Sequence, residues 1–121
     1  MNDLEKLVAY TRISKIKIQK KFGHAFVVGN RIYVDYEGSN VHFKINSVCG
    51  QVFLFLLDHK GHWKTRDDIG AYLDTAAVVF ASNSLEGYVG NVKFKLKTSR
   101  YYTIENGSQI GRSTEYRLVD R

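Results

Sequence analysis

The architecture of this 121-residue chain can be worked out from the segment LEGYVGNVKFKL, residues 85–96. Four aliphatic side chains in it recur at helical spacing and fall within about 60° of one another, which predicts one buried stripe. They are Leu85, Val89, Val92 and Leu96. Asn83 with Glu86 three residues later is the residue pair of a capping box. The sequence therefore predicts a helix over residues 83–97.

A central helix is expected upstream of this segment. Residues 48–57 are apolar on nearly every side, which is typical of a helix buried all round. Asn46 or Ser47 can cap its start, and it is expected to stop near Lys60. Trp63 follows this stop and is expected to fill the core between the central helix and the next one.

A short helix is predicted between the central helix and the helix over residues 83–97. Thr65 followed by Asp68 is again a capping-box pair, with acidic residues in the first turn. The apolar stripe of this helix consists of Ile69, Tyr72 and Leu73. Residues 75–81 fit either a linker packed on the core or a brief strand.

Residues 1–46 are expected to form a short helix and then an antiparallel sheet. Asn2 or Asp3 can cap the helix, and from Ile16 the apolar period changes to two. The next strands are predicted around the tight Gly29-Asn30 loop and along the alternating residues 41–45. The face expected to be apolar on the strand after this loop carries Ile32, Val34 and Tyr36. The first strand also carries four lysines, interpreted as a solvated face or as extra phosphate contacts: Lys15, Lys17, Lys20 and Lys21.

The chain is predicted to end in a hairpin. Residues 100–105 and 114–119 are expected to be strands on either side of a polar, glycine-rich loop. The expected fold class is α+β, in the order sheet, three helices, hairpin. One domain over residues 1–121 is predicted, with the helix and sheet in 1–46 and the helices and hairpin in 47–121.

Composition favours a polyanionic partner. The net charge is +6 and the isoelectric point is near 9.5, values that are common in nucleic-acid-binding proteins. A net charge of this size can also simply keep a protein soluble. A single cysteine, Cys49, fits a reducing compartment. No apolar run reaches the roughly 20 residues that span a bilayer, and the N-terminus is too polar for a signal peptide. A cytoplasmic, nucleoid-associated location is therefore expected.

Catalysis and metal binding are not expected. The sequence has no P-loop, nucleophile elbow, paired-cysteine motif or metalloprotease helix. His59, His62 and Cys49 fall short of a four-ligand metal pattern, and His59 is better placed to interact with a helix C-terminus. Asp67-Asp68 is explained by the electrostatics of a helix start. We therefore expect no enzyme activity, cofactor, metal or small-molecule substrate.

Helix, helix, helix, hairpin is the order of a winged helix-turn-helix domain. With the N-terminal sheet before it, residues 24–119 resemble the DNA-binding effector domains of OmpR/PhoB-type response regulators. The resemblance is carried by four segments: Phe53–Leu57 with Gly61; Lys64–Ile69, similar to the family's Thr-Arg opening of the second helix; Leu85–Leu96, similar to its recognition helix; and Glu115–Val119, similar to the strand that closes its wing.

The chain departs from that family in three ways. The residues before the sheet are too few for a receiver domain, so a standalone effector domain is expected. The wing is longer, and Glu115 replaces a turn glycine. The outer face of the third helix carries two glycines, Asn91 and Phe94 where the family has arginines and other polar readers. The two glycines, Gly87 and Gly90, cost about 2 kcal/mol relative to alanine, which close approach of a phosphate backbone or of a protein would explain.

The resemblance implies a sequence-specific DNA-binding transcriptional regulator. The third helix (83–97) is expected in the major groove, and the wing (100–119) on the adjacent backbone or minor groove. The residues expected to contact double-stranded DNA are Thr65, Arg66, Asn91, Lys93, Phe94, Lys95, Lys97, Arg100, Arg112 and Arg117. Asn91 is suited to adenine and Arg112 to a narrow minor groove. Phe94 fits a thymine methyl, a protein contact or the core.

Two other functions stay open at this point. The glycines and Phe94 on the outer face also fit a protein-interaction winged helix that binds RNA polymerase or another nucleoprotein component. The chain also fits the cytoplasmic part of a longer, membrane-anchored regulator. In the DNA-binding interpretation, a dimer or a partner protein is expected, because one small module buries a limited interface.

Overall fold

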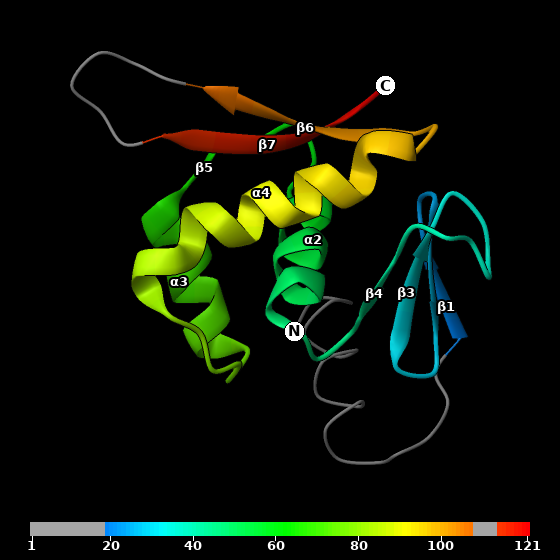
Figure 1. Ribbon diagram of the computed structural model, residues 1–121, viewed down its shortest axis with the longest axis horizontal. Coiled ribbons are helices and arrows are strands. Elements are labelled where there is room, and N and C mark those ends of the chain that lie inside the picture. The colour runs from blue at the N-terminus through cyan, green and yellow to red at the C-terminus, as the bar shows by residue number, and fades with distance from the viewer. Residues whose placement is uncertain (1–18, 108–113) are drawn as a thin grey trace.

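The computed structural model describes residues 19–107 and 114–121. They form an α+β structure with a four-stranded antiparallel sheet, three α-helices and a three-stranded sheet, which confirms the predicted class at this level (Figure 1). Apolar residues from both sheets and all three helices join in one core cluster. The predicted N-terminal helix, the start of the first strand and the tip of the hairpin with Arg112 lie outside the described residues.

The N-terminal sheet has the order β1-β2-β3-β4, and every neighbouring pair is antiparallel. Its strands are β1 (Gln19–Phe22), β2 (Ala25–Val28), β3 (Arg31–Val34) and β4 (His42–Lys44). Val28 pairs with Arg31, so the predicted two-residue Gly29-Asn30 loop is confirmed. Gly29 has a φ of 62°, the left-handed conformation that such a tight turn requires.

The prediction that Tyr36 shares the inner face of β3 is wrong. The strand ends at Val34 because Asp35 has a φ of 78°, which turns the backbone out of the sheet. The Asp35 carboxylate is held by Ser99 Oγ at 2.7 Å and by the Arg100 backbone N–H at 2.8 Å. These contacts stabilise the unusual conformation and leave Tyr36 61% exposed.

Helix α2 (Val48–Asp58) is the buried central helix. Ser47 is its cap and accepts a hydrogen bond from the Gly50 N–H at 3.0 Å. Gly50 is required here because a β-carbon at this position would collide with the Lys44 carbonyl. The buried Gln51 side chain donates to the Ile45 carbonyl and accepts from the Tyr72 hydroxyl, so its polar atoms are satisfied.

Helix α3 (Arg66–Thr75) starts with the predicted capping box. Asp68 N–H donates to the Thr65 hydroxyl at 3.1 Å, and Thr65 N–H donates to the Asp68 carboxylate at 2.9 Å. The segment after this helix is a linker and not a strand: Val78 packs on the core, whereas Val79 is 95% exposed.

Helix α4 (Leu85–Lys95) lies between two short 3₁₀ turns, η1 (Ser82–Ser84) and η2 (Leu96–Thr98). All four residues of the predicted stripe are buried. The predicted Asn83 capping box is wrong, because the 3₁₀ turn moves the cap to Ser84, which makes no side-chain cap bond in the described structure. Glu86 instead lies 3.8 Å from Arg66 on α3.

The second sheet has the order β5-β7-β6. The hairpin strands β6 (Tyr102–Gly107) and β7 (Glu115–Asp120) are paired throughout, and the two-residue strand β5 (Lys64–Thr65) joins the other edge of β7. Trp63, which leads into β5, is 38% exposed, so its expected place in the core is wrong. It packs on Gly107, where a β-carbon would lie 2.9 Å from the indole ring.

Candidate nucleic-acid interface

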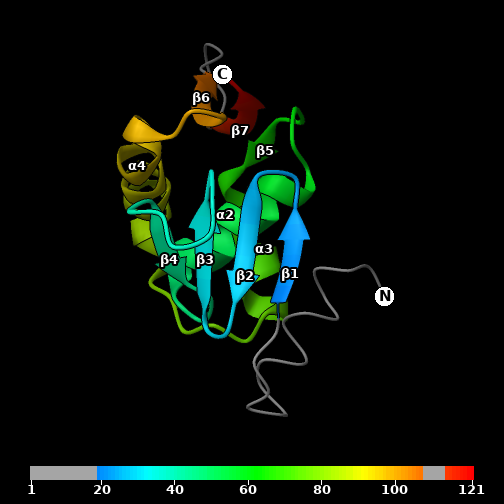
Figure 2. The same ribbon diagram turned by 90° about the vertical axis from the view of Figure 1, so that its right-hand side faces the viewer.

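Helix α4 presents one long side to solvent. Figure 1 shows it crossing in front of α2 and running beside the β6–β7 hairpin, and Figure 2 shows it at the outside of the molecule. The exposed residues opposite its buried stripe are Gly87, Gly90, Asn91 and Phe94. Phe94 is 74% exposed, so of its three expected environments the core is excluded.

The two glycines of this face are not required by internal packing. Neither Gly87 nor Gly90 has a positive φ. A β-carbon built at either position meets no heavy atom within 4 Å in the described structure. The glycines therefore leave the helix backbone bare on the side from which a partner would approach.

Lys93 and Lys97 lie on the flank of α4 that faces β6. With Phe94 they line a shallow groove of about 350 Å³, completed by Gly90, Thr103 and Arg121. Three cationic side chains thus surround one exposed ring, and no acidic residue lines the groove in the described structure. The groove can accommodate a planar or apolar group that carries negative charge.

Arg121 holds this groove together, and it is not among the site residues predicted from the sequence. Its guanidinium donates to the carbonyls of Leu96 at 3.0 Å, Lys97 at 3.3 Å and Tyr102 at 3.1 Å. Arginine at a helix C-terminus satisfies carbonyls that have no partner within the helix. Because Arg121 is 24 residues from Lys97 in the chain, no local pattern could show the contact.

Lys95 lies on the opposite flank of α4, beside β4. Its amine donates to the His42 carbonyl at 3.0 Å and lies 5.0 Å from the centre of the Phe43 ring. Burial raises the pKa of the nearby Cys49 thiol, while the charge of Lys95 and a hydrogen bond from the Asn91 side chain lower it. The basic cluster expected along α4 is therefore divided between two flanks, and Asn91 leans toward the start of α2.

Three other expected DNA contacts already have structural partners. The Thr65 hydroxyl caps α3, and Arg66 lies near Glu86. Arg117 lies 4.3 Å above the Trp63 ring and 3.1 Å from the Glu105 carboxylate. These residues stiffen the helix start and the hairpin, so any contact with a phosphate would compete with an existing interaction.

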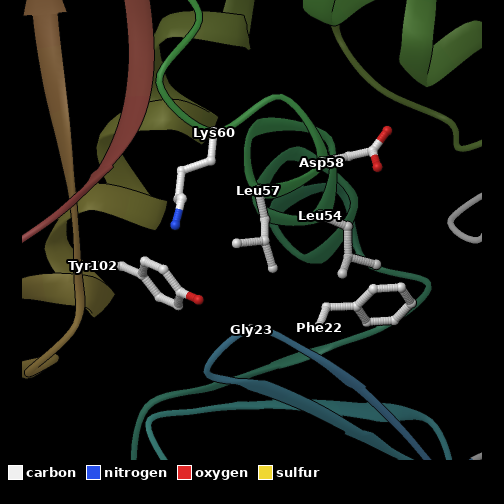
Figure 3. Close-up of a pocket in the computed structure, with 7 residues that line it drawn as sticks. All are labelled: Phe22, Gly23, Leu54, Leu57, Asp58, Lys60 and Tyr102. Carbon is white, nitrogen blue, oxygen red and sulfur yellow. The ribbon is translucent and has the colours of Figure 1, made fainter.

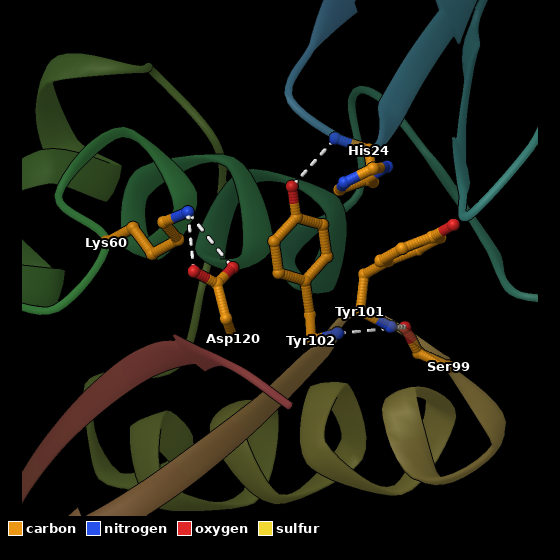
Figure 4. A network of polar contacts seen from close by, with 6 residues as sticks. All are labelled: His24, Lys60, Ser99, Tyr101, Tyr102 and Asp120. Carbon is orange, nitrogen blue, oxygen red and sulfur yellow. Dashed lines mark hydrogen bonds and ion pairs between the residues drawn. The ribbon is translucent and has the colours of Figure 1, made fainter.

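The start of β6 is fixed to the N-terminal sheet, as Figure 4 shows. The rings of His24 and Tyr101 stack at 3.6 Å, and the His24 N–H donates to the Tyr102 hydroxyl at 2.8 Å. The hydroxyl of Ser99 accepts from the Tyr102 N–H at 3.2 Å. Arg100 is held by its backbone on Asp35, and its side chain is exposed.

A second cavity, of about 260 Å³, lies between the β1–β2 turn and the C-terminal half of α2 (Figure 3). Its walls are mainly apolar: Phe22, Leu54, Leu57 and Tyr102, with Gly23, Asp58 and Lys60. The Lys60 amine pairs with Asp120 at 3.0 Å and lies on the side away from Asp58. These lining residues bring together no nucleophile and general base.

Within residues 19–107 and 114–121, no group of three or more His, Cys, Asp or Glu side chains is placed to hold a metal ion. None of the helices described is both long enough and apolar enough to cross a membrane. No protein-family model matches the sequence, and no curated protein sequence matches it.

Proposed function

We propose that this protein is a sequence-specific DNA-binding transcriptional regulator with a winged-helix fold. Helix α4 enters the major groove of double-stranded DNA, and the β6–β7 hairpin is the wing that contacts the adjacent backbone or minor groove. The proposal extends the resemblance of residues 24–119 to OmpR/PhoB-type effector domains. Such a regulator acts at the nucleoid, as a dimer or with a partner protein, and carries out no catalytic step.

The observation that carries this proposal is the charge on both flanks of an exposed helix. Successive helical residues turn by about 100°, so Lys93 and Lys95 lie about 160° apart around α4. An α-helix with its side chains is about 10–12 Å wide, close to the width of the major groove. Lysines on both flanks therefore match the two phosphate backbones that border this groove, and Lys95 exchanges its hydrogen bond with the His42 carbonyl for a phosphate contact.

The face between these flanks is suited to base edges. Asn91 can form a paired hydrogen bond with adenine, and Phe94 can contact a thymine methyl group. Gly87 and Gly90 let the helix backbone approach closely, since nothing in the described structure occupies the space beside them. Base contacts of this kind confer sequence preference, whereas the lysines add affinity for any duplex.

The test is duplex binding measured by fluorescence anisotropy against salt concentration. About four to six phosphate contacts give a log–log slope near −4 to −5. Lys97→Ala should reduce that slope by about 1 on a selected site and on a scrambled duplex alike. Asn91→Ala should cost about 1–3 kcal/mol on the selected site and little elsewhere.

Lys60→Ala is the matched control, because it removes the same charge from a lysine that pairs with Asp120 away from α4. It should leave the slope near that of the wild-type protein. A flat salt response of the wild-type protein, or equal binding of selected and scrambled duplexes, would contradict a sequence-specific regulator.

The exposed Phe94 in its basic groove favours a second candidate function, a winged helix that binds RNA polymerase or another nucleoprotein component. If that function is correct, Phe94→Ala abolishes capture of the protein partner and leaves duplex affinity intact. If α4 reads bases, the same substitution lowers the preference for the selected site.

A further inference from the structure

The β1–β4 sheet has a second face that the proposed function does not use. The side chains directed at α2 are fully buried: Ala25, Val27, Ile32, Val34 and Phe43. Since successive side chains of a strand point to opposite faces, the alternate residues lie on the other side. We call this the outer sheet face, formed by Lys21, Phe26, Val28, Arg31, Tyr33, His42 and Lys44. Figure 2 shows the sheet from this side, with α2 and α3 behind it and α4 at its edge.

The outer sheet face carries a row of side chains across all four strands, with a lysine on β1 and ring-bearing residues on β2, β3 and β4. The register pairs Lys21 with Phe26, Phe26 with Tyr33, and Tyr33 with His42. Neighbouring strands are about 4.8 Å apart, so the row is about 14 Å long. Phe26 and Tyr33, on the two central strands, are half-buried and present ring surface on a flat support. A row of this kind can stack planar groups side by side.

Positive charge surrounds these rings. The Lys21 amine lies 5.5 Å from the centre of the Phe26 ring, and Arg31 Nη1 lies 3.3 Å from His42 Nδ1. In the next row Arg31 is paired in register with Lys44. No acidic residue belongs to the outer sheet face, and the nearest one along β3, Asp35, is held by Ser99 and Arg100. The face is therefore complementary to an anion that carries flat rings.

Membranes and apolar protein surfaces match this face less well. The large apolar side chains that protrude in the described structure are elsewhere: Tyr36, Trp63, Val79, Phe94 and Tyr101. Insertion into a lipid interface or an apolar protein groove uses protruding side chains. Flat, half-buried rings between cations suit the stacking of exposed bases beside phosphates.

We propose that the outer sheet face binds single-stranded nucleic acid. Bases stack on Phe26 and Tyr33, and Lys21, Arg31 and Lys44 contact the phosphates. A duplex cannot make these contacts, because its bases are already stacked and only their edges are accessible in the grooves. This site is separate from α4 and does not depend on the proposed duplex binding.

The experiment compares a labelled dT12 oligonucleotide with an abasic phosphodiester chain of the same length, both titrated with the full chain. Stacking makes the wild-type protein bind dT12 more tightly than the abasic chain. Tyr33→Ala should weaken dT12 binding about 5- to 140-fold, the loss typical of one stacked base. It should leave binding of the abasic chain unchanged, because the ring acts only on bases.

Tyr36→Ala is the matched control, since it removes a more exposed tyrosine from the turn after β3, off the outer sheet face. It should leave dT12 binding unchanged. Phe26→Leu provides a second variant that keeps an apolar side chain at the half-buried position, and circular dichroism melts confirm that every variant is folded. Lys97→Ala should weaken duplex binding and spare the preference for dT12 over the abasic chain, which separates this site from α4.

Three results would overturn the proposal. The first is equal binding of dT12 and the abasic chain by the wild-type protein, which would mean attraction to phosphate alone. The second is wild-type dT12 affinity in folded Tyr33→Ala and Phe26→Leu variants. The third is binding to phosphatidylserine vesicles with no binding of dT12 at low salt, which would assign the face to a membrane.

Discussion

Replacing both glycines of α4 by alanine should stabilise the fold and weaken DNA binding at the same time. Gly87 and Gly90 lie inside an 11-residue helix, and their β-carbon positions are open in the described structure. Alanine at an exposed helical position is favoured over glycine by about 1 kcal/mol. The double variant should therefore gain about 2 kcal/mol, because a β-carbon at either position meets no heavy atom within 4 Å in the described structure.

For a chain of this size, 1 kcal/mol corresponds to about 4 °C in Tm, so we expect a rise of about 8 °C. Circular dichroism melts measure this directly. The two added methyl groups would lie between the α4 backbone and the base edges in the major groove of the DNA. Affinity for a selected duplex should therefore fall about tenfold, equivalent to about 1.4 kcal/mol. Anisotropy titrations at one fixed salt concentration measure that loss.

Ala71→Gly on α3 is the matched control, because Ala71 is exposed in the middle of a helix that the proposal does not place in the major groove. It should cost about 1 kcal/mol of stability and leave duplex affinity unchanged. If the double variant is stabilised but binds the duplex as the wild-type protein does, the outer face of α4 does not meet DNA. If the double variant is not stabilised, the interpretation that the two glycines cost helix stability and meet no neighbouring atoms is wrong.

Three further predictions concern the fold itself. Leu56→Ala empties a fully buried site of α2 and should cost about 2–5 kcal/mol in urea denaturation; a loss below about 0.5 kcal/mol would mean that α2 is not the core helix. Thr65→Ala removes the α3 cap and should cost about 1 kcal/mol, with Thr65→Ser retaining most of that stability. Since burial raises the pKa of the Cys49 thiol, less thiolate exists at a given pH, and alkylation at about pH 8.5 should be slower than in the urea-unfolded chain. Equal rates would contradict a protected thiol.

Features that depend on neighbours in the chain could be predicted from the sequence. The stripe of α4, the Thr65–Asp68 capping box and the Gly29-Asn30 hairpin loop each arise from residues that are close together in the sequence. Their physics is local, so a spacing pattern is sufficient to find them.

Features that depend on distant residues could not be predicted in this way. Strand β3 ends early because Asp35 is held by residues 64 and 65 positions further along the chain. Trp63 looked like a core residue by type, but it packs on Gly107 under the Arg117 guanidinium. A residue's type gives its preference for burial, whereas the partner that satisfies the preference is set by the tertiary fold.

In the candidate interface, too, features set by residues close in the sequence could be predicted, and features set by distant residues could not. Spacing alone placed Phe94 opposite the buried stripe, and it is exposed there. The separation of Lys93 from Lys95 follows from the helical turn, but only the fold shows that Lys95 reaches the His42 carbonyl. Arg121 completes the groove from the end of a strand, where no helical pattern could indicate it.

The contacts of His24 with Tyr101 and Tyr102 have a consequence for the order of folding. These contacts close a loop of 78 residues, against 11 for the contact between Arg31 and His42 inside the sheet. Loop-closure entropy makes the longer loop about 1.7 kcal/mol more costly. The sheet can pair early from local contacts, while β6 joins it late. A nascent chain that still lacks Ser99 and Tyr102 leaves Asp35 and His24 without these partners, so native packing around them must wait until residues 99–102 have left the ribosome.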